Sequence, residues 1–313
     1  MSVYTPLSES DINSLLAGYD LGALVSFRGI EAGIENTNYF VTTTDGEFVL
    51  TLFEHHHGDE VREFVQLARH LGDKGLAVPA PISNRNNVWL HDLCNRPAIL
   101  CQRLPGSHVA NPQPGHCQAI GEALARMHVA AADLNPRRVN DRGYDWWISI
   151  SPELSSDLSA DDQALLNDEL EHQRQHHEAW IMLPHGWIHG DLFHDNVLFS
   201  GEQQLGAILD LYNACDGALL YDLAIIANDW CCTVNGDWKE GAVEALLAGY
   251  ESVRPLTAEE KDCWPLVLRG AALRFWLSRL LTVRIQRLRA AEMTLHKDPD
   301  EFKHKLLMRR AAQ

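Results

Sequence analysis

The stretch His189-Gly190-Asp191-Leu192-Phe193-His194-Asp195-Asn196-Val197-Leu198-Phe199 is the most informative part of the chain. It follows an apolar, tryptophan-containing run at residues 180–188 and ends in a short β-like segment. A second apolar run follows at residues 205–209 and ends in an acid, Asp210. These patterns predict Asp191 and Asn196 on a loop between two short strands, and Asp210 at the end of the next strand.

The same three side chains suit the transfer of a phosphoryl group. A carboxylate can orient an alcohol nucleophile and accept its proton, and this is the role that we assign to Asp191. Mg²⁺, which holds a nucleoside triphosphate, prefers carboxylate and amide oxygens, so Asn196 and Asp210 are the candidate metal ligands. A turn with a capping aspartate would explain any one of these residues, whereas the ordered set favours a functional site.

These segments resemble the aminoglycoside phosphotransferase and choline kinase group of small-molecule kinases. His189-Gly190-Asp191 resembles the catalytic-loop triplet, and Asp210 resembles the aspartate of the Asp-Phe-Gly motif. The segment 216–224 resembles the group's Gly-Asp-Pro-x-x-Asp-Leu-Ala segment, in which Asp222 is expected to brace the catalytic loop by hydrogen bonds. The resemblance implies an α+β, two-lobed protein-kinase-like fold. A β-rich nucleotide-binding lobe is expected over residues 1–104, and a mainly helical catalytic and substrate-binding lobe over residues 105–313.

A narrower resemblance, to the homoserine kinases built on this fold, rests on residues 33–41 and 47–54, with Gly75–Pro81 in support. In that branch a threonine stands where most kinases of the fold carry a phosphate-binding lysine, and here that residue is Thr51. The resemblance implies phosphorylation of the hydroxyl of L-homoserine, a step toward threonine, with ATP and Mg²⁺ as cofactors. The usual lysine–glutamate pair is absent, which leaves Glu63, the expected helix acid, without its partner.

The expected nucleotide contacts fall in three places: the loop between the first two strands, Thr51 at the usual lysine position, and the hinge between the lobes. The loop between the first two strands contains glycines, asparagines and a threonine whose N–H groups and side chains can bond phosphate oxygens. The hinge of the resembling fold would bond the adenine edge and line the base pocket. The candidates are Gly33, Asn36, Thr37, Asn38, Thr51, Leu100, Gln102 and Leu104.

Homoserine also carries an ammonium, which needs an acid, and a carboxylate, which needs an arginine or backbone N–H groups. Candidate contacts lie directly after Asp210 and on the arginine-rich last long helix. They are Tyr212, Asn213, Arg274 and Arg279.

Composition limits the partners. The net charge of −17 argues against a nucleic-acid partner, because its phosphates would be repelled. The seven cysteines include no Cys-x-x-Cys pair, so reduced thiols are expected. No apolar run is long enough for a membrane span, and Met1–Pro6 lacks the features of a signal peptide, so a cytoplasmic protein is expected.

Periodicity and turn signals predict the other elements. The expected strands are residues 23–28, 39–43, 47–53, 88–91 and 98–104, with a hairpin around Asp45-Gly46. The expected helices are residues 7–20, 59–74, 115–131, 160–180, 217–232, 238–250 and 258–291. Gly121 is expected to permit close helix packing.

Three alternatives stay open from the sequence. The first is a kinase of another small alcohol, such as choline, an aminoglycoside, a methylthioribose or a fructosamine. The second is a nucleotide-binding pseudokinase, which the missing lysine motivates. The third is a metal-dependent hydrolase, which the lack of a histidine-rich cage disfavours. The oligomeric state and the group that replaces the lysine are not predicted.

Overall fold

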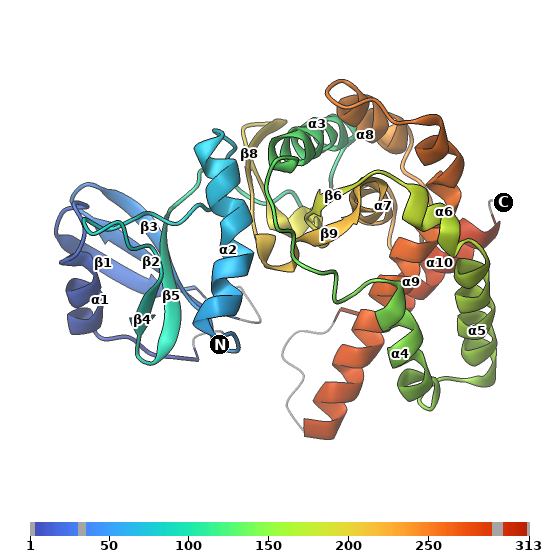
Figure 1. Cartoon of the computed structure of the whole chain (residues 1–313), viewed down its shortest axis with the longest axis horizontal. Helices are drawn as coiled ribbons and strands as arrows, with labels where there is room; N and C mark the ends of the chain where they lie inside the picture. Colours follow the sequence, from blue (N-terminus) through green and yellow to red (C-terminus); the bar gives the residue numbers. More distant parts are fainter. Residues whose placement is uncertain (1–3, 31–35, 290–296, 312–313) are drawn as a thin grey trace. The chain divides into compact units, whose positions relative to one another are not determined.

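The computed structural model describes residues 4–30, 36–289 and 297–311, and the chain divides into two compact units (Figure 1). The first unit comprises Met1–Ser107 and Gly206–Tyr212, and the second comprises His108–Leu205 and Asn213–Gln313. Sequence reasoning did not place residues 206–212 with the N-terminal part. The Ile208 N–H donates to the Ala77 carbonyl at 3.0 Å, a contact between distant segments that carries no local signature.

The first unit is built on a five-stranded antiparallel sheet with strand order β1-β2-β3-β5-β4. The strands are β1 (Leu24–Gly29), β2 (Thr37–Thr43), β3 (Gly46–Leu52), β4 (His91–Leu93) and β5 (Arg96–Gln102). The β2–β3 hairpin closes with Thr43 opposite Gly46, so the predicted hairpin around Asp45-Gly46 is confirmed. Its register sets Thr51 opposite Asn38.

One helix packs on each face of this sheet. Side chains alternate along β3, so every second residue points to the same face. The cluster on the side of α1 (Glu9–Leu16) includes Ile12, Leu16, Phe48, Leu50, Leu52 and Leu100. The cluster on the side of α2 (Gly58–Asp73) includes Phe53, Val61, Val65, Ile99 and Cys101. Thr51 lies between Leu50 and Leu52, and alternation therefore turns it toward the α2 side.

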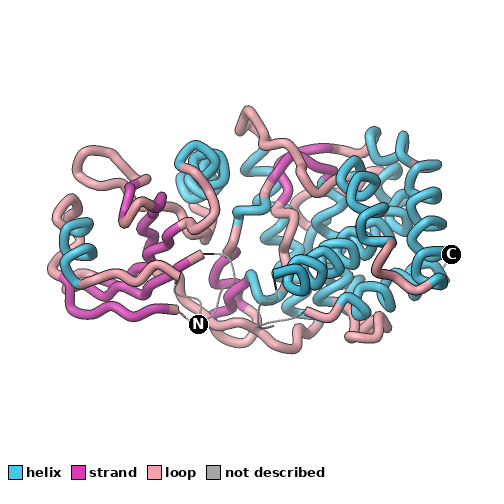
Figure 2. The backbone as a smooth tube through the Cα atoms, turned by 90° about the horizontal axis from the view of Figure 1, so that it is seen from below, coloured by secondary structure: helices cyan, strands magenta, loops and turns pink. Residues whose placement is uncertain are grey.

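The second unit is mainly helical, and Figure 2 shows the helices that fill it. The helices are α3 (Pro114–Ala131), α4 (Tyr144–Ser155), α5 (Ala160–Gln175), α6 (His177–Met182), α7 (Leu219–Trp230), α8 (Ala242–Glu251), α9 (Ala258–Arg289) and α10 (Pro299–Ala311). The short elements are β6 (His185–Ile188), η1 (His194–Asn196), β7 (Val197–Ser200), β8 (Gln204–Ile208), η2 (Leu211–Asn213) and β9 (Cys215–Ala218). β6 pairs with β9, and β7 pairs with β8, which continues into the first unit.

The structure corrects the expected helices at two points. The helix expected over 160–180 is two helices, α5 and α6, which meet at His176. Neither α4 nor α10 was predicted. α4 contains Pro152, which lowers the helical expectation of its segment.

Helix α7 is the centre of the second unit, because all of its residues except Asp229 are buried. Nearby, α3 and α8 approach through glycines. A Cβ at Gly121 would lie 2.2 Å from the Leu246 carbonyl oxygen, and one at Gly249 would lie 2.1 Å from the Gln118 carbonyl oxygen. The prediction that Gly121 permits close packing is therefore confirmed. Among the described helices, none combines the length and the apolar character that crossing a membrane requires.

Candidate active site

The loop from His189 to Asn196 follows β6 and begins with a turn at Gly190, where a larger residue would be strained. Gly190 has φ of 75°, in the left-handed region. A Cβ there would also lie 3.0 Å from the Asn213 carbonyl oxygen. The loop therefore turns sharply directly before Asp191.

A buried carboxylate on α7 holds this turn. Asp222 is fully buried and accepts the His189 N–H at 2.6 Å and the Gly190 N–H at 2.8 Å. His128 of α3 adds a contact from Nε2 to the same carboxylate at 3.1 Å. Hydrogen bonds to an ionised acceptor are stronger than neutral ones, so this brace is firm. The expectation that Asp222 braces the catalytic loop is confirmed.

The last turn of α7 holds the second half of the loop. The Asp229 carboxylate accepts the His194 N–H at 2.8 Å and contacts His194 Nδ1 at 2.7 Å. The hydrogen bond to Asp229 raises the pKa of His194, although partial burial opposes the rise. The Trp230 indole donates to the Leu192 carbonyl at 3.1 Å. Asp222 and Asp229 are about two helical turns apart and thus share one face of α7.

Asp191 is held by its backbone and has a cation nearby. The Asn196 amide nitrogen donates to the Asp191 carbonyl at 2.8 Å. This bond occupies the nitrogen end of the amide, so the amide oxygen is the end that suits a metal ion. Arg274 Nη1 of α9 lies 3.9 Å from Asp191 Oδ1, which is too long for a hydrogen bond.

The other candidate metal ligand, Asp210, belongs to the first unit and follows β8. Its φ of 56° is a left-handed conformation, which aspartate tolerates better than most residues. Within the described ranges, no group of three or more His, Cys, Asp or Glu side chains could hold a metal ion. An amide and a carboxylate oxygen fit Mg²⁺, which keeps waters and phosphate oxygens among its ligands.

Thr51, at the usual lysine position, takes part in a small polar cluster of the first unit. Its hydroxyl donates to Asn38 Oδ1 at 2.7 Å across the β2–β3 pair. The Tyr212 hydroxyl forms a side-chain hydrogen bond with Thr51, and burial raises the pKa of Tyr212. The Tyr212 ring meets Phe53 edge-on, with the centroids 5.1 Å apart. Tyr212, expected to contact substrate, is thus placed in the first unit beside two expected nucleotide contacts.

Other expected nucleotide contacts have different surroundings. Thr37 is fully buried, donates to Glu54 Oε1 at 2.5 Å and accepts the N–H groups of Tyr4 and Thr5. Its hydroxyl therefore holds the N-terminal segment against β2. Leu100 is fully buried in the cluster on the α1 side, so its side chain offers no surface to a nucleotide.

The remaining members of that set vary in exposure. Asn36 is buried, and its side-chain oxygen has no hydrogen-bond partner among the described residues. Gln102 is exposed at the end of β5, and Leu104 is half-buried. Gly33 lies outside the described residues. Glu63 is exposed on α2.

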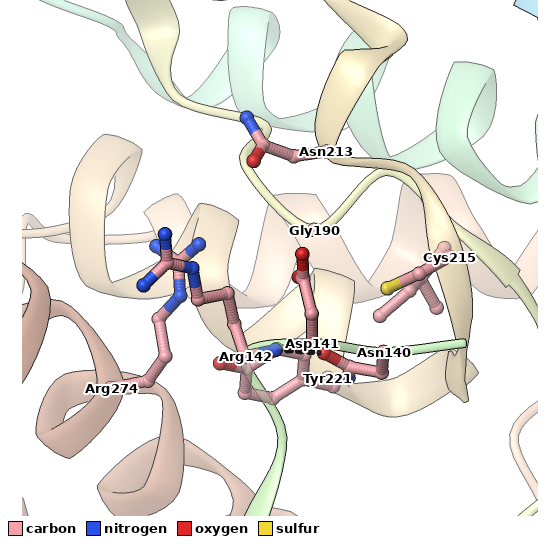
Figure 3. Close-up of a pocket in the computed structure, with 9 residues that line it drawn as sticks. Asn140, Asp141, Arg142, Gly190, Asn213, Cys215, Tyr221 and Arg274 are labelled. Atoms are coloured by element: carbon pink, nitrogen blue, oxygen red, sulfur yellow. Dashed lines mark hydrogen bonds between the residues drawn. The ribbon is translucent and has the colours of Figure 1, made fainter. Parts of the chain in front are cut away.

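A pocket of the second unit lies beside the catalytic loop (Figure 3). Two of the expected substrate contacts, Asn213 and Arg274, line it. Arg279 does not: its guanidinium donates to Glu301 at 2.7 Å and to the Asp298 carbonyl at 2.7 Å. The complete lining is Asn140, Asp141, Arg142, Ile188, Gly190, Asn213, Cys215, Tyr221 and Arg274.

Sequence reasoning missed the segment from Asn140 to Arg142. It lies in a part of the chain without a motif, and only the fold brings it to the catalytic loop. Tyr221 was also missed, although it is next to Asp222. Burial raises the pKa of the Tyr221 phenol, so its hydroxyl stays protonated and can donate a hydrogen bond.

Residues 26–256 match the phosphotransferase enzyme family, and the chain belongs to this family. It is similar to a homoserine kinase of Methylobacillus flagellatus, with 44% identity over 96% of this chain and 93% of that protein. It is 45% identical to a homoserine kinase of Neisseria meningitidis serogroup B, over 98% of this chain and 99% of that protein. The homoserine kinase of Pseudomonas aeruginosa is 41% identical over 99% of this chain and 96% of that protein.

Two solved structures show the same fold at low sequence identity. A complex of amicoumacin kinase hAmiN matches with a TM-score of 0.69 and 15% identity, over 97% of this chain and 92% of that one. The choline kinase of Cryptosporidium parvum matches with a TM-score of 0.68 and 11% identity, over 97% of this chain and 96% of that one. The recognised family and the expected α+β protein-kinase-like fold are therefore confirmed.

Proposed function

We propose that this protein is a homoserine kinase, which transfers the γ-phosphoryl group of ATP to the hydroxyl of L-homoserine. The observation that carries the proposal is the 40–45% identity to homoserine kinases over nearly the whole chain. Choline and aminoglycoside kinases resemble the chain in fold alone. The substrate is thus a small amino-acid alcohol.

Asp191 is the proposed catalytic base. Its carboxylate receives the hydroxyl proton of homoserine while the hydroxyl oxygen bonds to the γ-phosphorus. The bond from that phosphorus to the bridging oxygen breaks at the same time, and ADP leaves with its electron pair. The braces from Asp222 and Asp229 keep the loop, and with it the Asp191 backbone, in one position. A fixed base requires little rearrangement when the reaction begins.

Asn196 and Asp210 are the proposed Mg²⁺ ligands, through the amide oxygen and the carboxylate. When bound between these two side chains, the ion would neutralise charge on the phosphates. Asn36, Asn38, Thr51, Gln102 and Leu104 remain the proposed nucleotide contacts among the described residues. Thr51 brings no positive charge, and its hydroxyl donates to Asn38 Oδ1.

Arg274 and Asn213 are the proposed contacts for the amino-acid end of the substrate, because both line the pocket beside Asp191. Arg279 is a weaker proposal, since its guanidinium is paired with Glu301. We place the reaction in the cytoplasm, where ATP and a reducing environment agree with seven unpaired cysteines.

The test is an assay of ATP consumption with Mg²⁺ and L-homoserine, beside choline, serine and an aminoglycoside. Turnover with homoserine is expected, and Asp191→Asn should lower kcat roughly 10²- to 10⁴-fold because the base is lost. Asp195→Asn is the matched control, because that carboxylate lies on the same loop and pairs with Lys297 at 2.7 Å. It should leave kcat within about threefold.

Each other outcome changes a different part of the proposal. Turnover of another alcohol, but not homoserine, would keep the site and replace the substrate. ATP binding without turnover of any alcohol would favour the pseudokinase, with Thr51 as the reason. Equal losses in the Asp191 and Asp195 variants would contradict the assignment of the base.

A further inference from the structure

Two arginines from distant segments line the pocket of the second unit. Arg142 precedes α4, and Arg274 lies on α9. Figure 3 shows both guanidinium groups turned to the same side of the pocket. Two positive charges in one small pocket repel each other, and an anion bound there would remove that repulsion.

Arg274 is positioned to receive such an anion. Its side chain is only 9% exposed, and its contact with Asp191 is 3.9 Å long, beyond hydrogen-bonding distance. The guanidinium carbon lies 3.9 Å from the centroid of the Phe275 ring, a contact that limits its movement. A planar guanidinium held in this way can bind a carboxylate through two parallel hydrogen bonds.

Arg142 has a fixed backbone and an exposed side chain. Its N–H donates to Asn140 Oδ1 at 2.9 Å, and its carbonyl accepts the Trp147 indole N–H at 2.9 Å. The guanidinium carbon lies 4.9 Å from the centroid of the Trp146 ring. The backbone bonds do not use the side chain, so Arg142 can be substituted without disturbing them.

Tyr221 supplies an independent sign of a ligand. The residue is 7% exposed, and its hydroxyl is buried without a hydrogen-bond partner among the described residues. Buried hydroxyl groups in folded proteins nearly always have a partner. A carboxylate oxygen bound in the pocket would accept a hydrogen bond from the Tyr221 hydroxyl.

The pocket also contains a negatively charged side chain. Asp141 lines the pocket, and Arg138 Nη2 lies 2.9 Å from its Oδ2. A carboxylate accepts several hydrogen bonds, so Asp141 can bond an ammonium as well. In Figure 3 its carboxylate points toward Gly190 and Asn213, away from the two guanidinium groups. The pocket thus separates positive from negative groups, as a zwitterion does.

We infer that Arg142, Arg274 and the Tyr221 hydroxyl bind the α-carboxylate of the alcohol substrate, which makes Arg142 and Tyr221 specificity-determining residues. The inference rests on the proposed function, because it takes the substrate to be an amino acid. Beyond the proposed function, the inference explains why the site would reject other alcohols. A cationic alcohol without a carboxylate meets two guanidinium groups of like charge and offers no anionic group to either of them.

The test compares L-homoserine with 3-aminopropan-1-ol, which has the same hydroxyl and ammonium but no carboxylate. Wild-type enzyme should prefer homoserine strongly. Arg142→Gln and Tyr221→Phe should each raise KM for homoserine, roughly tenfold to a hundredfold for Arg142→Gln and less for Tyr221→Phe. Neither variant should lower kcat/KM for 3-aminopropan-1-ol, so the preference for homoserine shrinks.

The control is Arg126→Gln, which removes an exposed arginine of α3 that pairs with Glu122 and lies outside the pocket lining. Arg126→Gln should leave kcat and KM unchanged for both substrates. Tyr221→Phe should also leave the melting temperature unchanged, because it deletes a hydroxyl that forms no hydrogen bond with the described residues.

The inference and the proposed function fail in different ways. Homoserine turnover with an unchanged KM in Arg142→Gln would overturn the inference and leave the function intact. Equal losses for both substrates would also overturn it, because they would indicate a general structural role. A wild-type enzyme that prefers an alcohol without a carboxylate would overturn both.

Discussion

At the scale of single residues, the candidate site depends on two acids of α7 that hold the loop from His189 to Asn196. Asp229 binds both the backbone and the ring of His194, and Asp222 binds two successive backbone N–H groups. Neither acid is among the residues that line the pocket, although Asp222 bonds the N–H of Gly190, which is one of them. Their effect on catalysis is therefore through position, and it can be tested apart from chemistry.

The contact between His194 and Asp229 predicts a specific pH dependence of the unfolding free energy. Because Asp229 raises the pKa of His194 above its unfolded value, the charged pair stabilises the fold fully below about pH 6.5. That stabilisation is lost as the pH rises through the raised pKa. Asp229→Asn should lower the pKa of His194 and remove this part of the pH dependence. NMR titration of the His194 ring and urea unfolding at several pH values measure both effects.

The control for this prediction is Asp161→Asn, which changes an exposed acid in the first turn of α5. It should leave the His194 titration unchanged. A His194 pKa that stays raised in Asp229→Asn would show that another group causes the shift.

The buried surroundings of Thr51 indicate that a lysine at this position would destabilise the protein. Thr51 is 5% exposed and bonds Asn38, whereas Glu63, the expected partner of a lysine, is exposed on α2. Thr51→Val should cost roughly 1 kcal/mol of unfolding free energy through the lost hydrogen bond. Thr51→Lys should cost roughly 3–5 kcal/mol, because it buries a charge without a partner. Urea unfolding compares the two, and equal costs would contradict the burial argument.

At the scale of elements, the packing of α3 on α8 depends on missing side chains. The backbone of each helix occupies the space where a Cβ of the other's glycine would stand. Helices approach this closely only where small residues meet, so Gly121 and Gly249 set the distance between these two helices. The contact matters for the site because α3 also carries His128, which contacts Asp222.

Gly249→Ala should therefore destabilise the protein by roughly 1–3 kcal/mol through overpacking, even though alanine is the better helix former. The control is Gly58→Ala at the start of α2, where the nearest atom to a new Cβ is Leu90 Cδ2 at 3.9 Å. That change should be neutral or slightly stabilising. Thermal unfolding of both variants provides the comparison, and a neutral Gly249→Ala would mean that α8 shifts freely.

At the scale of the whole molecule, the net charge of −17 opposes the compact state through self-repulsion. Salt screens such repulsion, so the unfolding free energy should rise between about 0.02 M and about 0.5 M NaCl. Glu202→Lys combined with Glu240→Lys, both exposed positions, should raise stability at low salt and weaken the salt dependence. A fall in stability with salt would show that attractive ion pairs outweigh the net repulsion.

The sequence alone determined the family, the fold class, the loop with Asp191 and Asn196, and Asp210 after the next strand. These features could be predicted because they depend on local order along the chain: a glycine before the acid, apolar strands on either side, and a fixed spacing to the next acid. The β2–β3 hairpin was predictable for the same reason. The roles assigned to these side chains remain predictions.

The tertiary structure decided what surrounds them. Alternation in β5 sent Leu100 into the core, a placement that depends on strand pairing and on the helix above the sheet. Arg274 and Arg279 lie on the same helix and look equivalent in sequence, yet one lines the pocket and the other pairs with Glu301. Asn140, Asp141 and Arg142 reach the pocket from a segment without a motif. Contacts between distant segments form only when the chain folds, and no local pattern of residues records them.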